Sequence, residues 1–111
     1  MRAVTTLDDF LALLPDDGKE ELNKLREIIR RSEEYRNFLV GTIRSKLCAD
    51  ERIRLLIFGI YTRISYAEYS ICFRFIEKWS RALAQRKVIA PLTDKVKMEL
   101  TRELYTRLIG T

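Results

Sequence analysis

The side chains most able to do chemistry in this chain are cations that share one face of a predicted helix. Arg74, Lys78 and Arg81 recur at intervals of four and three residues, and Gln85 follows four residues later. On a helix this spacing forms one stripe, with neighbours about 5–6 Å apart. That interval is close to the phosphate repeat along a nucleic-acid strand, and arginine grips a phosphate with two hydrogen bonds. The stripe therefore predicts contact with a phosphate backbone, and the alternatives are a solvated face or an acidic protein partner.

A second group of cations flanks a predicted turn around Cys48. It has only Asp50 and Glu51 close by in sequence, and it consists of Arg44, Lys46, Arg52 and Arg54. Residues 35–90 carry eleven basic and four acidic side chains, whereas residues 1–34 carry six and nine. Such asymmetry is typical of a protein with a polyanionic partner or an acidic protein partner. We therefore predict that both groups bind DNA or RNA backbone without sequence specificity, within a larger nucleoprotein assembly.

Aromatic residues are concentrated between positions 61 and 79, at helical spacing. Each such side chain buries about 150–250 Å² in a core, so a core role is commoner for them than base stacking. Phe75 and Trp79 lie at the edge of the predicted apolar arc, and Phe58 adds apolar surface on the other side of its helix. We expect these three residues to be exposed at an interface with a protein partner or a second copy of the chain.

Signatures of catalysis and of cofactor binding are missing from the sequence. The chain contains no histidine, which excludes Ser-His-Asp and Cys-His catalysis and histidine-ligated zinc. Its four glycines stand alone, so no phosphate-binding loop is formed. Cys48 and Cys72 are 24 residues apart with no other donors clustered nearby, so we predict neither a metal site nor another cofactor. We expect a non-enzymatic protein with no small-molecule substrate.

The sequence also lacks the features of a secreted or membrane-spanning chain. No apolar signal core follows Met1, and the longest uncharged run, residues 55–62, is far shorter than the about 20 residues that cross a bilayer. Two isolated cysteines fit a reducing compartment. We expect a cytoplasmic protein with no membrane partner.

The elements that position these residues are predicted to be helices. Thr6 and Asp50 precede apolar segments of helical period and fit N-cap positions, as does either Thr93 or Asp94 before the last segment. Pro15 is predicted to end the first helix, with residues 16–18 forming a turn.

For two longer segments, the sequence does not decide between one helix and two. Residues 19–47 fit either one helix, straight or kinked near Ser32, or two helices that meet there. Residues 51–87 fit either one helix or two helices with Ser65 as the second cap.

The whole pattern predicts one all-α domain over residues 1–111, a compact bundle of four to six helices with no sheet. No run alternates apolar and polar residues long enough to form a half-buried strand. The two central helical segments carry more apolar surface than so small a chain buries alone. An alternative function is therefore a protein–protein interaction module, either a homodimer or an adaptor subunit, with no role in nucleic-acid binding.

Overall fold

The computed structural model describes residues 2–44 and 50–110, and this part of the chain is all-α, as predicted. Four helices follow one another: α1 (Leu7–Ala12), α2 (Asp16–Arg44), α3 (Glu51–Gln85) and α4 (Asp94–Ile109). No strand occurs within the described ranges, where the one β-type pairing is an isolated bridge between Arg2 and Ile89.

Side chains that cap the first turn begin three of the four helices, at the predicted positions. Each cap accepts a hydrogen bond from a backbone N–H two or three residues later, which satisfies a donor that the helix itself leaves free. The caps are Thr6 for α1, Asp50 for α3 and Thr93 for α4.

Pro15 is followed directly by α2 and not by the turn that the sequence predicted. The helix begins at Asp16, so the predicted turn at residues 16–18 is wrong. The N–H of Lys19 donates to the carbonyl of Pro15 at 3.0 Å, so Pro15 directly precedes the first helical turn. A proline is tolerated there because no intrahelical hydrogen bond needs its missing N–H.

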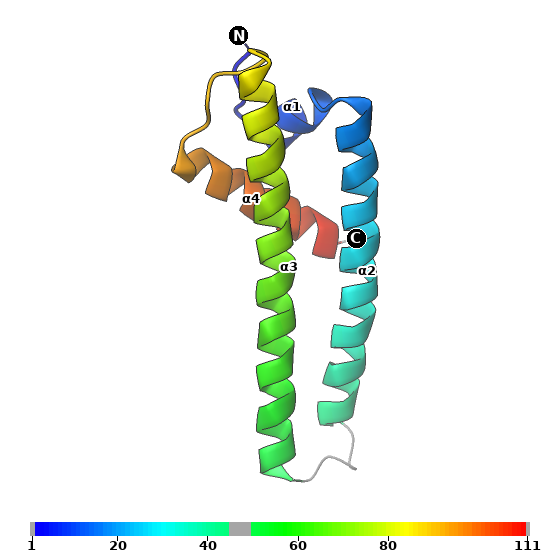
Figure 1. The fold of residues 1–111 in the computed structure, drawn as a ribbon. Helices are drawn as coiled ribbons and strands as arrows, with labels where there is room; N and C mark the ends of the chain where they lie inside the picture. Colours follow the sequence, from blue (N-terminus) through cyan, green and yellow to red (C-terminus); the bar gives the residue numbers. More distant parts are fainter. Residues whose placement is uncertain (1, 45–49, 111) are drawn as a thin grey trace.

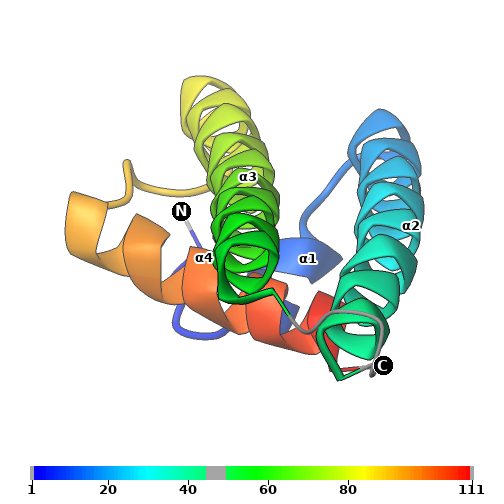
Figure 2. The same ribbon diagram turned by 90° about the horizontal axis from the view of Figure 1, so that it is seen from below.

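Both central segments are continuous helices, because Ser32 and Ser65 lie inside α2 and α3. The two helices run antiparallel as a long hairpin (Figure 1). Seen from below, α1 and α4 lie on the same side of this hairpin, so its opposite face, which we call the open face, is uncovered (Figure 2).

The hairpin of α2 and α3 extends beyond α1 and α4, which cover only part of its length. The molecule measures 58 × 25 × 17 Å, with a radius of gyration of 17.3 Å, whereas a compact domain of this length has about 13 Å. The predicted compact bundle is therefore confirmed only in part: the described chain has four helices, but its shape is somewhat extended. We call residues 35–44 and 50–66 the arm. We call the rest of the described chain, which includes α1 and α4, the body.

The core of the body draws on all four helices and on the segment after α3. Its best buried members include Leu7 and Phe10 from α1, Ile29 from α2, Ile76 from α3 and Leu104 from α4. These side chains come from opposite ends of the sequence, so the body folds only when α1 and α4 reach the same face of the hairpin.

Phe75 and Trp79 belong to this core, so the prediction that they are exposed is wrong, and their role at an interface stays a prediction. Each is only 5% exposed. The indole N–H of Trp79 donates to the carboxylate of Glu21. A Cβ atom at Gly18 would lie 3.3 Å from both the Trp79 ring and Leu14, so the glycine provides the space into which the indole packs. Neighbouring elements pack against α3 on two sides, so a wider part of its surface is buried than one neighbouring helix would cover.

Candidate interaction site

The arm has a small core of its own, formed between its two helices. Leu39 from α2 and Ile57 from α3 are buried against each other, with Ile43, Tyr61 and Ile64 packed around them. Because two helices bury only their facing sides, other apolar side chains of the arm remain in solvent. In the described part of the arm, eight large ones are 40–75% exposed: Tyr35, Phe38, Ile53, Leu55, Leu56, Phe58, Ile60 and Tyr66.

Phe58 lies on the side of α3 that faces α4 further along the helix. Tyr69, eleven residues later, points in nearly the same direction, and its ring packs 5.8 Å from that of Tyr105 in α4. α4 meets the arm at the end nearest the body, where Asp94 and Met98 line a hollow with Tyr66. Phe58 lies about two helical turns further along the arm and is 55% exposed. Its exposure agrees with the sequence-based expectation, and its role in binding a partner stays a prediction.

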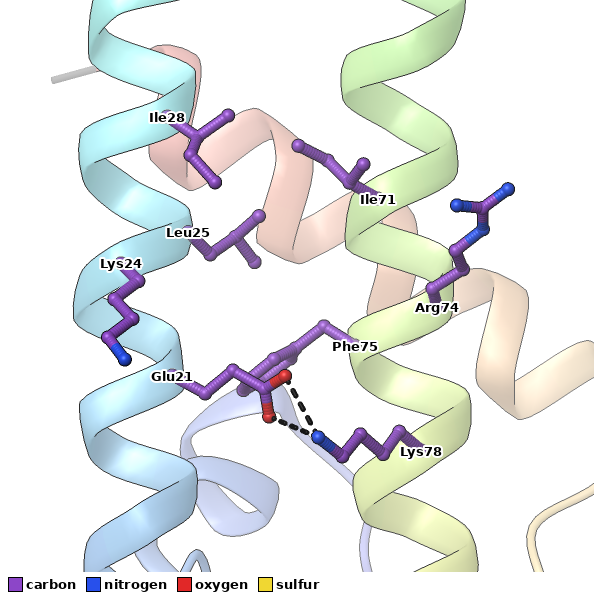
Figure 3. Close-up of a pocket in the computed structure, with 8 residues that line it drawn as sticks. All are labelled: Glu21, Lys24, Leu25, Ile28, Ile71, Arg74, Phe75 and Lys78. Atoms are coloured by element: carbon purple, nitrogen blue, oxygen red, sulfur yellow. Dashed lines mark hydrogen bonds and ion pairs between the residues drawn. The ribbon is translucent and has the colours of Figure 1, made fainter.

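On the open face, a groove lies between α2 and α3 at the level of the body (Figure 3). It has a volume of about 380 Å³. Its apolar lining comes from Leu25, Ile28, Ile71 and Phe75, and its polar lining from Glu21, Lys24, Arg74 and Lys78. Ile28 is 54% exposed there, which leaves an apolar hollow within a charged rim.

The predicted basic stripe on α3 is exposed, but two of its three cations already have acidic partners. Lys78 forms an ion pair with Glu21 at 3.0 Å and Arg81 forms one with Glu77 at 3.1 Å. Arg74 has no acidic partner among the residues that the structure describes. Such exposed pairs are weak, but they lower the positive charge that the stripe offers to a polyanion.

The second predicted group lies at the far end of the arm. Arg44, Arg52 and Arg54 are exposed there, and within the described ranges none of them forms an ion pair. Lys46 lies outside the described residues. Arg52 is 22 residues from Arg74 along α3, or about 33 Å, so the structure does not bring the two groups together.

A buried charged network joins the arm to the body, and the sequence analysis did not identify it. Arg36 of α2 is 8% exposed and Glu68 of α3 is 2% exposed. Arg36 Nη2 donates to Glu68 Oε2 at 3.2 Å, and its Nε lies 2.8 Å from Oε1. The hydroxyl of Tyr105 donates to Glu68 Oε1 at 3.2 Å, which ties α4 to the same carboxylate.

A signal for this network is present in the sequence. Arg36 lies seven residues after Ile29 and three before Leu39, so it occupies an apolar-phase position of α2. Glu68 lies midway between Ile64 and Cys72 on the buried side of α3. Two opposite charges that each interrupt an apolar face predict a buried pair, provided that the two helices are known to face each other.

Titratable groups near Glu68 are held in their ordinary charge states. Burial, with the nearby charge of Glu68, raises the pKa of the Cys72 thiol to about 12. The same two causes raise the pKa of Tyr105. Burial alone would lower the pKa of Arg36, but the Tyr61 hydroxyl and the Glu68 carboxylate together raise it. At neutral pH the thiol is therefore protonated and a poor nucleophile.

Metal sites and membrane spans are not found in the parts of the chain that the structure describes. No three carboxylate or cysteine side chains gather there as a set of metal ligands. None of the helices there combines the length and the apolarity that crossing a bilayer requires. Comparisons with protein-family models, with curated proteins and with solved structures give no match to this chain. Its function has to be inferred from its own surface.

Proposed function

We propose that this protein is a non-enzymatic interaction subunit whose arm docks on another protein. The observation that carries the proposal is the exposed apolar surface of the arm, described above. Isolated soluble domains rarely leave more than a few hundred Å² of contiguous apolar surface in water. Fully burying one Leu, Ile or Phe side chain contributes about 1.5–3 kcal/mol, so covering the arm provides a strong driving force for association.

The junction between arm and body supports the same function. The pair formed by Arg36 and Glu68 fixes where α2 and α3 leave the body, and Tyr105 links that pair to α4. A preorganised surface loses less conformational entropy when it binds. The network therefore fixes the direction in which the arm leaves the body, while the arm itself is held by its own small core.

Charged substitutions on the arm are expected to weaken association at least tenfold, since each tenfold change in Kd requires only about 1.4 kcal/mol. The variant Leu56→Glu/Phe58→Glu places a carboxylate on each exposed side of α3. Met98→Glu, on α4, is the matched control, because Met98 is 50% exposed and lies outside the arm. Light scattering over a hundredfold range of concentration measures the mass, and far-UV circular dichroism checks that each variant is folded.

Three results are possible, and each either supports or contradicts the proposal. A mass above 13.1 kDa that falls in the double variant but not in the control supports the proposal. A wild-type monomer whose arm amides exchange much faster than those of the body also supports it, because the arm then awaits a different protein. A wild-type monomer whose arm is as protected from exchange as its body contradicts the proposal.

A second candidate function, binding of a nucleic-acid backbone, is favoured by the three arginines at the end of the arm. Since none has an acidic partner in the described ranges, all three are free to contact phosphates. Three phosphate contacts predict that affinity falls roughly 40-fold between about 50 and 200 mM salt.

Charge reversal separates the two basic groups. Arg44→Glu/Arg52→Glu/Arg54→Glu is expected to abolish salt-sensitive binding of labelled single- and double-stranded oligonucleotides in fluorescence anisotropy. Arg74→Glu/Lys78→Glu/Arg81→Glu is expected to have a smaller effect, because two of its cations are already paired. If the first variant binds like the wild type, the end of the arm does not bind nucleic acid.

A further inference from the structure

The open face carries an apolar stripe along α3 at heptad spacing. Its members are spaced by four, three, four, three and four residues, which is the seven-residue repeat by which long helices pack side by side. This order of spacings is the same in both chain directions, with its midpoint at residue 62. The stripe consists of Ile53, Ile57, Ile60, Ile64, Ala67 and Ile71.

The stripe is only partly covered within one molecule. Ile57 is buried against Leu39 of α2, whereas Ile53 and Ile60 are 48% and 40% exposed. On the same face, Tyr35 of α2 is 50% exposed. An antiparallel second helix with the same stripe would place Ile53 opposite Ile71 and Ile60 opposite Ile64.

Charge at the two ends of the stripe is complementary in this alignment. Arg74 lies twelve residues after the midpoint and Asp50 twelve before it, so each meets the other across two antiparallel copies. Asp50 and Glu51 are the only acidic residues between positions 35 and 66, and Arg74 has no acidic partner in the described ranges. A parallel pair in register would instead bring the two Arg74 side chains together, a repulsive arrangement.

The groove on the open face supplies the hollow that such a pairing requires. Ile71 lines it, with Arg74 and Lys24 on its rim (Figure 3). In the antiparallel alignment, Ile53 of one copy enters the groove of the other, and Asp50 and Glu51 come to the side of the rim that carries Arg74. The same contact occurs twice, as the symmetry of a closed dimer requires.

We propose that the open face binds a second copy of this chain, antiparallel, with α3 against α3, as a homodimer. This inference rests on the proposed function, because it names the partner. From Arg74 to Asp50 the hairpin is about 36 Å long and two helices of about 10 Å wide, a footprint of roughly 700 Å² per copy. Stable interfaces bury about 800 Å² per partner.

Engineered disulfides test the alignment directly. Ile53 and Ile71 are 18 residues apart on one helix, or about 27 Å, far beyond the about 7 Å that a disulfide spans. In a Cys48→Ser background, Ile53→Cys/Ile71→Cys is therefore expected to form covalent dimers under mild oxidation, seen on a non-reducing gel. Neither single variant is expected to cross-link, and Cys72 is buried.

A charge exchange provides an independent test without cysteine. Arg74→Glu is expected to raise the dimer Kd at least tenfold, and adding Glu51→Arg is expected to restore most of the affinity. Arg102→Glu, an equal change of charge on α4, is the control and is expected to leave the Kd unchanged. A folded Arg74→Glu variant that dimerises like the wild type overturns the proposed pairing.

Failure of the dimer and failure of the proposed function give different results. Cross-linking by Ile53→Cys alone, or a mass above twice 13.1 kDa, overturns the antiparallel dimer but leaves the arm as an interaction surface. A wild-type monomer whose arm amides exchange rapidly also overturns the dimer but leaves the arm as an interaction surface. A monomer with a fully protected arm overturns both.

Discussion

Replacing Arg36 with methionine is expected to lower the free energy of unfolding by about 3–5 kcal/mol, because it leaves the Glu68 carboxylate buried without its counter-ion. Glu68 is 2% exposed, so water cannot take the place of the guanidinium. Tyr105 supplies one hydrogen bond to the carboxylate, which does not neutralise its charge. Urea denaturation followed by the fluorescence of Trp79, the only tryptophan, measures the loss.

Two further variants show whether the effect belongs to the buried pair. Arg36→Met/Glu68→Met removes both charges and is expected to recover most of the lost stability, because the unpaired carboxylate is gone. Arg31→Met removes an exposed ion pair with Glu27 and is expected to cost less than about 1 kcal/mol. If Arg36→Met costs no more than Arg31→Met, the network does not hold the arm to the body.

Substitution of Trp79 by alanine is the other change expected to be severe, at about 3–5 kcal/mol, since it opens a large cavity in the body core. The indole also donates to Glu21, and its ring lies 5.3 Å from the Lys78 ammonium. Thermal denaturation followed by circular dichroism measures the loss, because the variant has no tryptophan to report.

The control for this prediction is an exposed aromatic residue on the same helix. Tyr66 is 75% exposed, so Tyr66→Ala is expected to change stability by no more than about 0.5 kcal/mol at a concentration that favours the monomer. Equal losses in the two variants would show that Trp79 does not anchor the body core.

The network at Arg36 also separates two apolar clusters. Leu39 and Ile57 form the cluster of the arm, and the core of the body lies on the other side of Glu68. Because polar atoms intervene, the arm depends on its own few contacts and on this network. A partner that covers its apolar faces therefore stabilises the arm more than the body.

Local chemistry in the sequence was sufficient to predict the starts of α1, α3 and α4 and the all-α class, but not the start of α2. Thr6 and Asp50 cap their helices through hydrogen bonds that span only two or three residues, so neighbouring residues contain all the information required. The exposure of Phe58 was also predictable, because it lies off the main apolar stripe of its own helix.

Tertiary structure alone decided how long the helices are and which surfaces they leave uncovered. Residues 16–18 fit a turn as well as a first helical turn, and Ser32 and Ser65 fit caps as well as interior positions. Local propensities differ too little to choose, whereas packing along the hairpin favours unbroken helices.

Burial and pairing depend on residues that are far apart in sequence. Trp79 is buried because α2 packs on one side of it, and its hydrogen-bond partner Glu21 lies 58 residues away. The same packing brings Glu21 to Lys78, and it encloses Arg36 with Glu68. The sequence by itself determined which segments are helical and how charge is distributed along them. Only the packing of four helices decided which of those charges are neutralised and which apolar side chains remain in solvent, because both depend on distances in space.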